Sequence, residues 1–233
     1  MNFFNKLFGL EKESIKANCI VCPANDASLF YSNDGKGVSR GLFYAVSNMP
    51  DYTVISTNYN LLAGDCVLAL KDSPCRNIFL FGSCGSTGAL EVGAAVAVKK
   101  AFSLESFSEM LQQKEMLQYM CFEGSGTLLG KMAASTSVDP GLVNCATVSS
   151  LMLESAYMDF YRKEDIRCVD MESSMIYSAA RVAGKEAASL LYVTDNVKSA
   201  GFYEELSPAL RGKIKNIRKK LSDELKDFVK CLK

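Results

Sequence analysis

The sequence predicts one α/β domain over residues 1–233, with three α/β/α layers and a mixed, mainly parallel central sheet. Several runs of four to six residues are apolar throughout, which is typical of strands buried on both faces. Helical patterns alternate with these runs, and that alternation favours a parallel sheet. No repeat, low-complexity tract or Pro/Ser-rich linker divides the chain, so a single domain is the prediction.

The individual elements follow from these patterns. Gly184 is expected to end the last internal helix, because glycine is common just past a helix end. The apolar runs predict strands at residues 18–23, 52–57, 77–81, 94–98, 166–169 and 189–194, and the helical patterns cover residues 61–73, 103–118 and 171–183.

The two ends of the chain are predicted to be amphipathic helices. Ser207 and Pro208 form a helix start, and apolar residues at steps of three and four from Leu210 to Leu232 predict about six turns. We expect this helix to cover the sheet, the alternative being a seam between subunits. Phe3, Phe4, Leu7 and Phe8 have helical spacing and are expected to pack on their own domain or on a partner subunit, the alternative being a membrane-surface helix.

Composition excludes several classes of function. Lys+Arg and Asp+Glu are both 26, which argues against a nucleic-acid surface, and no stretch is long and apolar enough for a membrane span. There are no histidines, so Ser-His-Asp triads, Cys-His dyads and His-ligated metals are excluded, and no cofactor or metal is expected. Nine cysteines, mostly in apolar runs, predict a reduced, cytoplasmic protein. The pair Cys19 and Cys22 is a poor zinc site, since zinc takes four ligands.

Acidic residues flank a predicted strand–helix–strand unit. Asp170 and Glu172 follow one strand, and Asp195 ends the next. Such a unit predicts two parallel strands, which would place these carboxylates on one edge of the sheet, where open α/β folds bind ligands. The alternative is structural: charges that favour a helix N-terminus, and a turn residue.

A glycine-rich stretch follows another strand. "FGSCGSTG" places Gly82, Gly85 and Gly88 after residues 77–81, and we expect a loop whose N–H groups can face an anion or that forms a tight turn. Its spacing does not fit a dinucleotide-binding fingerprint, and "GSGTLLGKM" does not fit a phosphate loop.

The segments "FGSCG", "VDMESS" and "YVTDN", in this order, resemble the nucleoside phosphorylase and nucleosidase superfamily, over residues 20–196. This family includes purine nucleoside and uridine phosphorylases and methylthioadenosine/adenosylhomocysteine nucleosidases. The resemblance implies a phosphorylase/hydrolase-like fold and cleavage of the N-glycosidic bond of a small-molecule, purine-like nucleoside. It implies that Asp195 is the general acid and that Glu172 and Met171 bind the sugar. "SSLMLES" resembles the base-stacking strand, with Met152 or Leu153 near the base.

The resemblance also implies where the attacking group lies. Gly82 and Ser83 would line the phosphate or water site, Arg40 would reach the site of a neighbouring subunit in a homo-oligomer, and Asp26 is the candidate for ordering water. Leu80 replaces an arginine that phosphorylases carry, which favours hydrolysis over phosphorolysis. The alternative is a non-catalytic nucleoside-binding or storage protein on the same fold.

Overall fold

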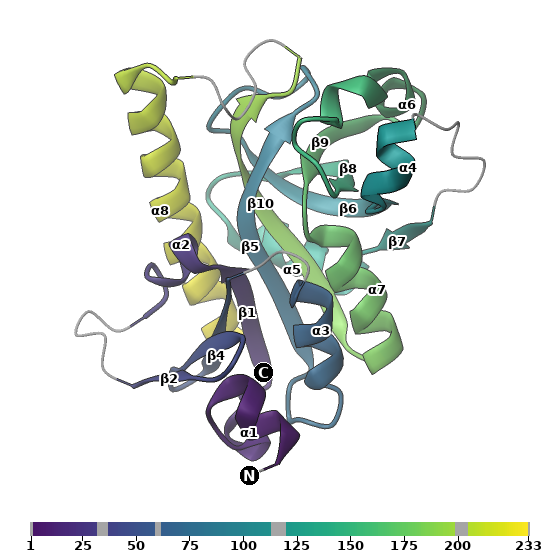
Figure 1. Cartoon of the computed structure of the whole chain (residues 1–233). Helices are drawn as coiled ribbons and strands as arrows, with labels where there is room; N and C mark the ends of the chain where they lie inside the picture. The colour runs from purple at the N-terminus through teal and green to yellow at the C-terminus, as the bar shows by residue number, and fades with distance from the viewer. Residues whose placement is uncertain (1, 32–36, 59–61, 113–119, 199–204, 233) are drawn as a thin grey trace.

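A mixed sheet of ten strands organises the computed structural model, which describes residues 2–31, 37–58, 62–112, 120–198 and 205–232 (Figure 1). The strand order is β10-β6-β8-β9-β5-β1-β4-β3-β2, and β7 pairs with β6. The strands are β1 Asn18–Pro23, β2 Val38–Arg40, β3 Tyr44–Asn48, β4 Tyr52–Thr57, β5 Asn77–Ser86, β6 Ala95–Leu104, β7 Cys121–Glu123, β8 Gly141–Val148, β9 Ile166–Asp170 and β10 Glu186–Asn196.

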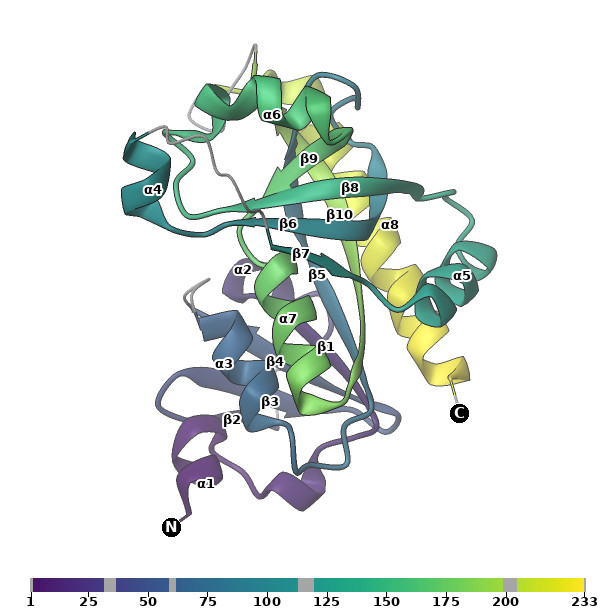
Figure 2. The same ribbon diagram turned by 90° about the vertical axis from the view of Figure 1, so that its right-hand side faces the viewer.

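One half of the sheet closes on itself. β5 pairs with β10 as well as with β9, so β5, β10, β6, β8 and β9 form a ring. Strands β6 and β8 cross steeply over β5 and β10 in Figure 2. The other half, from β1 to β2, stays open and continues from β5 through parallel pairing of β1 with β5 and β4. A closed half beside an open half creates a rim where strand ends from both meet.

Helices cover both faces of the sheet, as Figures 1 and 2 show. Apolar side chains of α1, α3 and α7 form one buried core with the sheet, and those of α2, α5 and α8 form another on the opposite face. The α/β class, with a mixed central sheet between helices, is therefore confirmed. The helices are α1 Phe3–Phe8, α2 Ala24–Ala27, α3 Leu62–Ala69, α4 Phe107–Gln112, α5 Gly126–Ser135, α6 Met158–Lys163, α7 Ser173–Ala183 and α8 Pro208–Cys231, with short 3₁₀ turns η1 Lys12–Ser14 and η2 Glu154–Tyr157.

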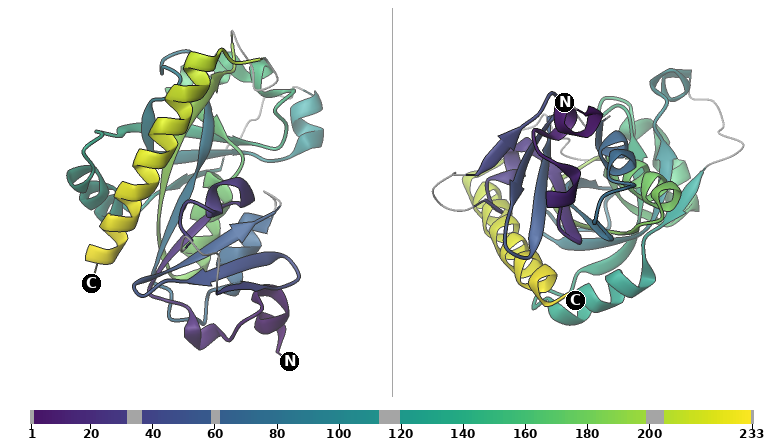
Figure 3. Two further views of the ribbon diagram at one scale, coloured as in Figure 1. Left: turned by 90° about the vertical axis from the view of Figure 1, so that its left-hand side faces the viewer. Right: turned by 90° about the horizontal axis from the view of Figure 1, so that it is seen from below.

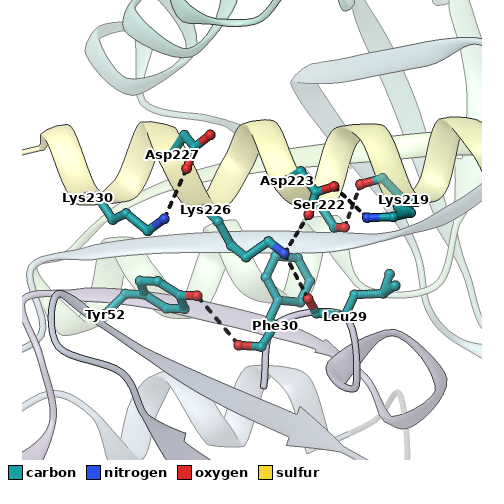
Figure 4. Close-up of polar contacts among 9 residues, drawn as sticks. All are labelled: Leu29, Phe30, Tyr52, Lys219, Ser222, Asp223, Lys226, Asp227 and Lys230. Atoms are coloured by element: carbon teal, nitrogen blue, oxygen red, sulfur yellow. Dashed lines mark hydrogen bonds and ion pairs between the residues drawn. The ribbon is translucent and has the colours of Figure 1, made fainter. Parts of the chain in front are cut away.

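Helix α8 lies along the sheet as a cover (Figure 3). The side chain of Ser207 accepts a hydrogen bond from the Leu210 N–H at 3.3 Å, as an N-cap does. Leu221 and Leu225 are fully buried against the sheet. Lys226 adds a polar anchor, because its Nζ donates to the Leu29 carbonyl at 3.1 Å and also pairs with Asp223 (Figure 4). The predicted covering helix is confirmed.

The N-terminal helix packs on its own domain. Phe8 stacks between Phe4 and Tyr44, with ring centroids 4.4 and 4.6 Å apart, whereas Phe3 stays 74% exposed. Cys19 and Cys22 are buried in cores on opposite faces of the sheet, as expected for alternating strand positions. In the described part of the chain, no helix combines the length and hydropathy needed to cross a bilayer.

Three predicted boundaries are wrong. Residues 103 and 104 belong to β6, so the helix predicted from 103 begins at Phe107 and is described only to Gln112; residues 113–119 lie outside the described residues. The helix predicted over 61–73 covers only α3. Strand β5 continues through Ser86, because both of its edges find partners there, so Gly82 and Gly85 lie in a strand and not in a loop.

Candidate active site

A cavity of about 220 Å³ lies where β5, β9 and β10 end beside η2 and the start of α7. Four carboxyl side chains line it, and no lysine or arginine among the described residues does. Its lining residues are Pro23, Ser83, Cys84, Gly85, Leu151, Glu154, Val169, Asp170, Met171, Glu172, Thr194 and Asp195.

Gly85 explains why these strand ends meet. It pairs with Val169 of β9 on one side and with Asp195 of β10 on the other. β9 is antiparallel to β5 whereas β10 is parallel to it, so the prediction that β9 and β10 are parallel is wrong. The ring closure, not a shared strand direction, brings Glu172 and Asp195 to one cavity.

Asp195 lies at the β10 end of the cavity with 5% of its surface exposed. The Thr194 hydroxyl donates to its Oδ1 at 2.7 Å. Burial raises the pKa of Asp195 above its ordinary value, the direction expected for a proton donor, and the Thr194 hydrogen bond opposes part of that rise. A Cβ atom at Gly85 would lie 3.1 Å from Asp195 Oδ2, which is tighter than an ordinary van der Waals contact, so a side chain there would press on the carboxylate.

Glu172 and Asp170 lie where β9 passes into α7. The two oxygens of Asp170 accept hydrogen bonds from the Thr147 hydroxyl at 2.7 Å and the Ser173 N–H at 2.9 Å, so Asp170 holds the start of the helix. Glu172 is 8% exposed and lines the cavity. Burial raises the pKa of Asp170 to about 6. Burial, and then the charge of Asp170, raise the pKa of Glu172 to about 8.

The segment after β8 lines the cavity with other residues than those predicted. Residues 149–153 form a turn that leads into η2, so the base-stacking strand predicted there is wrong. Met152 is 72% exposed, and neither Met152 nor Leu153 lines the cavity; Leu153 packs against the core around α6. Leu151 and Glu154 line it instead. Both stand in the quoted motif, but only the turn geometry shows which side chains face inward.

The predicted anion loop is a strand as far as Ser86, and of its three glycines only Gly88 lies in a bend. Gly82 and Ser83 pair with Leu191 and Tyr192 of β10. Ser83 lines the cavity, but Gly82 does not. The backbone edge of β5 toward β10 is therefore engaged in the sheet, and the hydroxyl of Ser83 is the polar side chain that this strand offers to the cavity.

The remaining predicted site residues lie outside the cavity. Asp26 is buried in α2, where it forms an ion pair with Arg218 and accepts a hydrogen bond from Tyr192 Oη at 2.9 Å. Burial raises the pKa of Asp26, and Arg218 opposes that rise. Arg40 is exposed on β2, and Leu80 is buried in the core on the α3 and α7 face. Within one chain, Asp26 and Arg40 therefore do not line the cavity, although the charge of Asp26 contributes to the raised pKa of Glu172.

A second, wider hollow of about 750 Å³ lies at the far end of α7. Lys100 there is paired with Glu123 at 3.0 Å, and Lys185 Nζ donates to the Cys75 carbonyl at 2.6 Å. These two lysines already have partners, whereas the smaller cavity gathers four carboxyl groups, so we assign the chemistry to the smaller one. Among the described residues, no group of three or more ligating side chains could hold a metal ion.

Solved structures share the fold over nearly the whole chain. Uridine phosphorylase from Vibrio fischeri has a TM-score of 0.70 at 16% identity, covering 95% of this chain and 93% of its own. The methylthioadenosine/S-adenosylhomocysteine nucleosidase of Helicobacter pylori has a TM-score of 0.69 at 13% identity, covering 94% and 99%. The Plasmodium knowlesi homologue of the P. falciparum purine nucleoside phosphorylase has a TM-score of 0.66 at 13% identity, covering 94% and 92%.

Sequence comparison gives the family. No curated protein matches the chain. The family model of the phosphorylase superfamily matches residues 65–229, which include β5, β9, β10 and the whole of α7. This match covers most of the chain and all but one of the cavity-lining residues, Pro23. The chain therefore belongs to the phosphorylase superfamily, which comprises nucleoside phosphorylases and nucleosidases that cleave glycosidic bonds.

Proposed function

We propose that this chain hydrolyses the N-glycosidic bond of a purine-like nucleoside. The observation that carries the proposal is the acidic lining of the cavity: four carboxyl side chains and, in the described part of the chain, no lining cation. Such a cavity suits a ligand rich in hydrogen-bond donors and a transition state that develops positive charge. Departure of the base gives the sugar an oxocarbenium character, so nearby carboxylates stabilise it electrostatically.

Asp195 is the proposed general acid. Cleavage is easiest when the departing base gains a proton, and a positioned acid contributes roughly 10²- to 10⁴-fold in rate. Burial favours the protonated form of Asp195. Thr194 fixes the carboxylate orientation through its 2.7 Å hydrogen bond, and Gly85 leaves the space into which it fits.

Glu172 is the proposed partner of the sugar hydroxyls. It precedes α7, whose N-terminal end is fixed by the Asp170 hydrogen bonds. A carboxyl group in this position can accept hydrogen bonds from two adjacent hydroxyls. Met171 lines the same wall and offers an apolar surface to the sugar. The same geometry would orient the glycosidic bond toward Asp195.

Water is the proposed nucleophile because, among the described residues, no cation lines the cavity to pair with a phosphate. Burial of a phosphate without a cation costs several kcal/mol. Leu80 is buried in the apolar core, and Arg218, which is paired with Asp26, does not line the cavity. Ser83 is the hydroxyl that can orient a water from β5.

A homo-oligomer is proposed from an apolar surface around α1 and α3. Phe3, Phe43 and Leu68 line a shallow apolar hollow there, and exposed Leu42 adjoins α1 through a 2.8 Å hydrogen bond from its N–H to the Lys6 carbonyl. A second copy of this chain is the proposed occupant. Arg40, close to this surface in sequence, would then be carried toward the neighbour.

The test is a product assay with purine nucleosides, with and without inorganic phosphate. We expect free base and free sugar at a rate independent of phosphate. Sugar 1-phosphate as the main product, at a rate proportional to phosphate, would refute hydrolysis. Tight nucleoside binding without any product would instead support a binding or storage role.

A further inference from the structure

Thr147 is a fully buried hydroxyl residue of β8 that does not itself line the cavity. Its hydroxyl donates a hydrogen bond to Asp170 Oδ1 at 2.7 Å and accepts one from the Ser174 N–H at 2.9 Å. The two bonds use the hydroxyl both as a donor and as an acceptor, which fixes its orientation. Thr147 therefore joins the end of β9 to the first turn of α7.

The two partners of Thr147 stand on either side of Glu172. Asp170 is two residues before Glu172 and Ser174 is two residues after it, so one hydroxyl holds the chain on both sides. Glu172 is the N-cap residue of α7, but its side chain makes no capping hydrogen bond to the helix. The position of this side chain at the cavity therefore depends on the backbone that Thr147 fixes.

The rest of α7 has anchors of its own. Ser173 Oγ and Ser189 Oγ of β10 form a hydrogen bond at 3.1 Å, and both residues are fully buried. One turn further on, the Tyr177 hydroxyl donates to the Val98 carbonyl of β6 at 2.7 Å and accepts from the Ser189 N–H at 3.0 Å. Loss of the Thr147 hydroxyl should therefore leave the helix on the sheet and loosen mainly its first turn.

We propose that Thr147 is a positioning residue, which aligns Glu172 with the hydroxyl groups of the sugar. This inference rests on the proposed function, because it takes Glu172 as the partner of those hydroxyls. A hydrogen bond between a hydroxyl and a carboxylate needs a distance of about 2.5–3.0 Å between the two oxygens. A displacement of about 1 Å can cost about 10²-fold in rate. Thr147 does not line the cavity, so it acts through Asp170 and Ser174.

The first experiment compares kcat/KM for adenosine and 2′-deoxyadenosine, which differ by one sugar hydroxyl. The wild-type protein should prefer adenosine by about 10- to 100-fold, the range of one hydrogen bond to a charged group. Thr147→Val keeps the shape of the side chain and removes its hydroxyl, so it should lower this preference by at least about fivefold. Thr147→Ser keeps the hydroxyl and should keep the preference. In a Glu172→Ala background, Thr147→Val should not change the ratio further, because the group that Thr147 positions is absent.

Thr53, near the start of β4, provides a matched control. It is also fully buried, and its hydroxyl donates to Asn48 Oδ1 at 2.6 Å and accepts from the Lys16 N–H at 2.9 Å. Thr53→Val thus removes the same two kinds of hydrogen bond, but neither partner lines the cavity. Its melting temperature should fall about as much as that of Thr147→Val, whereas its adenosine preference should equal that of the wild type. Equal losses of preference in the two variants would overturn the inference, because a general loss of stability would then explain both.

Amide hydrogen exchange separates failure of this inference from failure of the proposed function. Asp170 and Thr147 accept the N–H groups of Ser173 and Ser174, so exchange over residues 171–176 should be faster in Thr147→Val than in the wild type or in Thr53→Val. Unchanged exchange in Thr147→Val, or an adenosine preference that is absent from the wild type or unchanged in the variant, would overturn the inference even in an active enzyme. Faster exchange in a protein that neither binds nor cleaves nucleosides would instead refute the proposed function, while Thr147 would still hold the backbone around Glu172.

Discussion

Replacement of Thr194 by valine tests how the cavity sets the protonation of its acid. The Thr194 hydroxyl donates to Asp195 Oδ1 at 2.7 Å, a distance typical of an O–H group bound to a charged oxygen. This hydrogen bond stabilises the ionised carboxylate and so lowers the pKa that burial has raised. Valine keeps the shape of threonine and removes the donor. The pKa of Asp195 should therefore rise in Thr194→Val.

The size of the effect follows from the hydrogen bond that is lost. Hydrogen bonds to charged groups contribute about 1.5–3 kcal/mol, and 1.36 kcal/mol corresponds to one pH unit, so the apparent pKa should rise by about 1–2 units. Cleavage requires the protonated acid, so kcat/KM should fall with rising pH through this pKa. The alkaline limb of the profile should therefore move to higher pH in the variant.

The assay is kcat/KM for the best nucleoside substrate across pH 5–10. Thr136→Val is the matched control: Thr136 is also half-buried, but its hydroxyl donates to the Met132 carbonyl at the end of α5, away from the cavity. Its profile should match the wild type. An alkaline limb that stays in place in Thr194→Val, or moves to lower pH, would refute the assignment of Asp195 as the titrating acid.

Three further predictions follow from the same cavity and its surroundings. The folded state keeps protons on carboxyl groups with pKa values of about 6, 7 and 8, whereas unfolded carboxyl groups lose them near pH 4. The free energy of unfolding should thus fall as pH rises from about 4 to 8, and Glu172→Gln should make this pH dependence weaker. A wild-type melting temperature that is equal at pH 5 and pH 8, or higher at pH 8, would contradict this prediction. Gly85→Ala should lower kcat/KM at least about tenfold, because its Cβ would displace the carboxylate of Asp195. Gly82→Ala, whose Cβ would have its nearest contact at 3.7 Å, should change kcat/KM little. Equal effects of the two variants would argue against a precise position of the Asp195 carboxylate. Leu42→Asp should convert the oligomer to a monomer, as measured by light scattering, whereas Leu111→Asp, at another exposed leucine on α4, should not. A wild-type protein that is monomeric at micromolar concentration would exclude this interface.

Local patterns predicted the elements that periodicity defines. Helix α8 follows from its capping Ser207, Pro208 and apolar spacing, and α7 ends at Gly184 in the left-handed conformation, as the sequence predicts. The doubly buried strands β1 and β4 likewise follow from runs rich in apolar and β-branched residues. These elements depend on residues close in sequence, so a single sequence contains most of the information that forms them.

The errors arise where pairing between distant segments decides the structure. "GSCGS" has the composition of a turn, but pairing with β9 and β10 extends β5 through it. The chain direction of β9 relative to β10 depends on closure of the ring, which no local pattern contains. Glu154 was missed for the same reason. In the turn after β8, Met152 is exposed and Glu154 lines the cavity. The direction of side chains in a turn follows no periodic pattern, so the sequence does not predict it.

The sequence nevertheless predicts part of the site, because carboxyl side chains are uncommon in apolar surroundings. Glu172 and Asp195 were predicted to share one site, and both line one cavity, although the strand geometry behind that prediction was wrong. Asp26 and Arg40 were placed by resemblance alone. In the structure, Asp26 pairs with Arg218 and Arg40 is exposed, so neither lies in the cavity of its own chain.

The role of Asp195 as the acid is tested most directly by the turnover of Asp195→Asn with a purine nucleoside. Asparagine keeps the size of the buried side chain and its hydrogen bond with Thr194, but it cannot deliver a proton. In Asp195→Asn, kcat should fall at least about 10²-fold while the nucleoside still binds. Turnover close to that of the wild type, with the fold intact, would contradict the claim that this acidic cavity cleaves the glycosidic bond through Asp195.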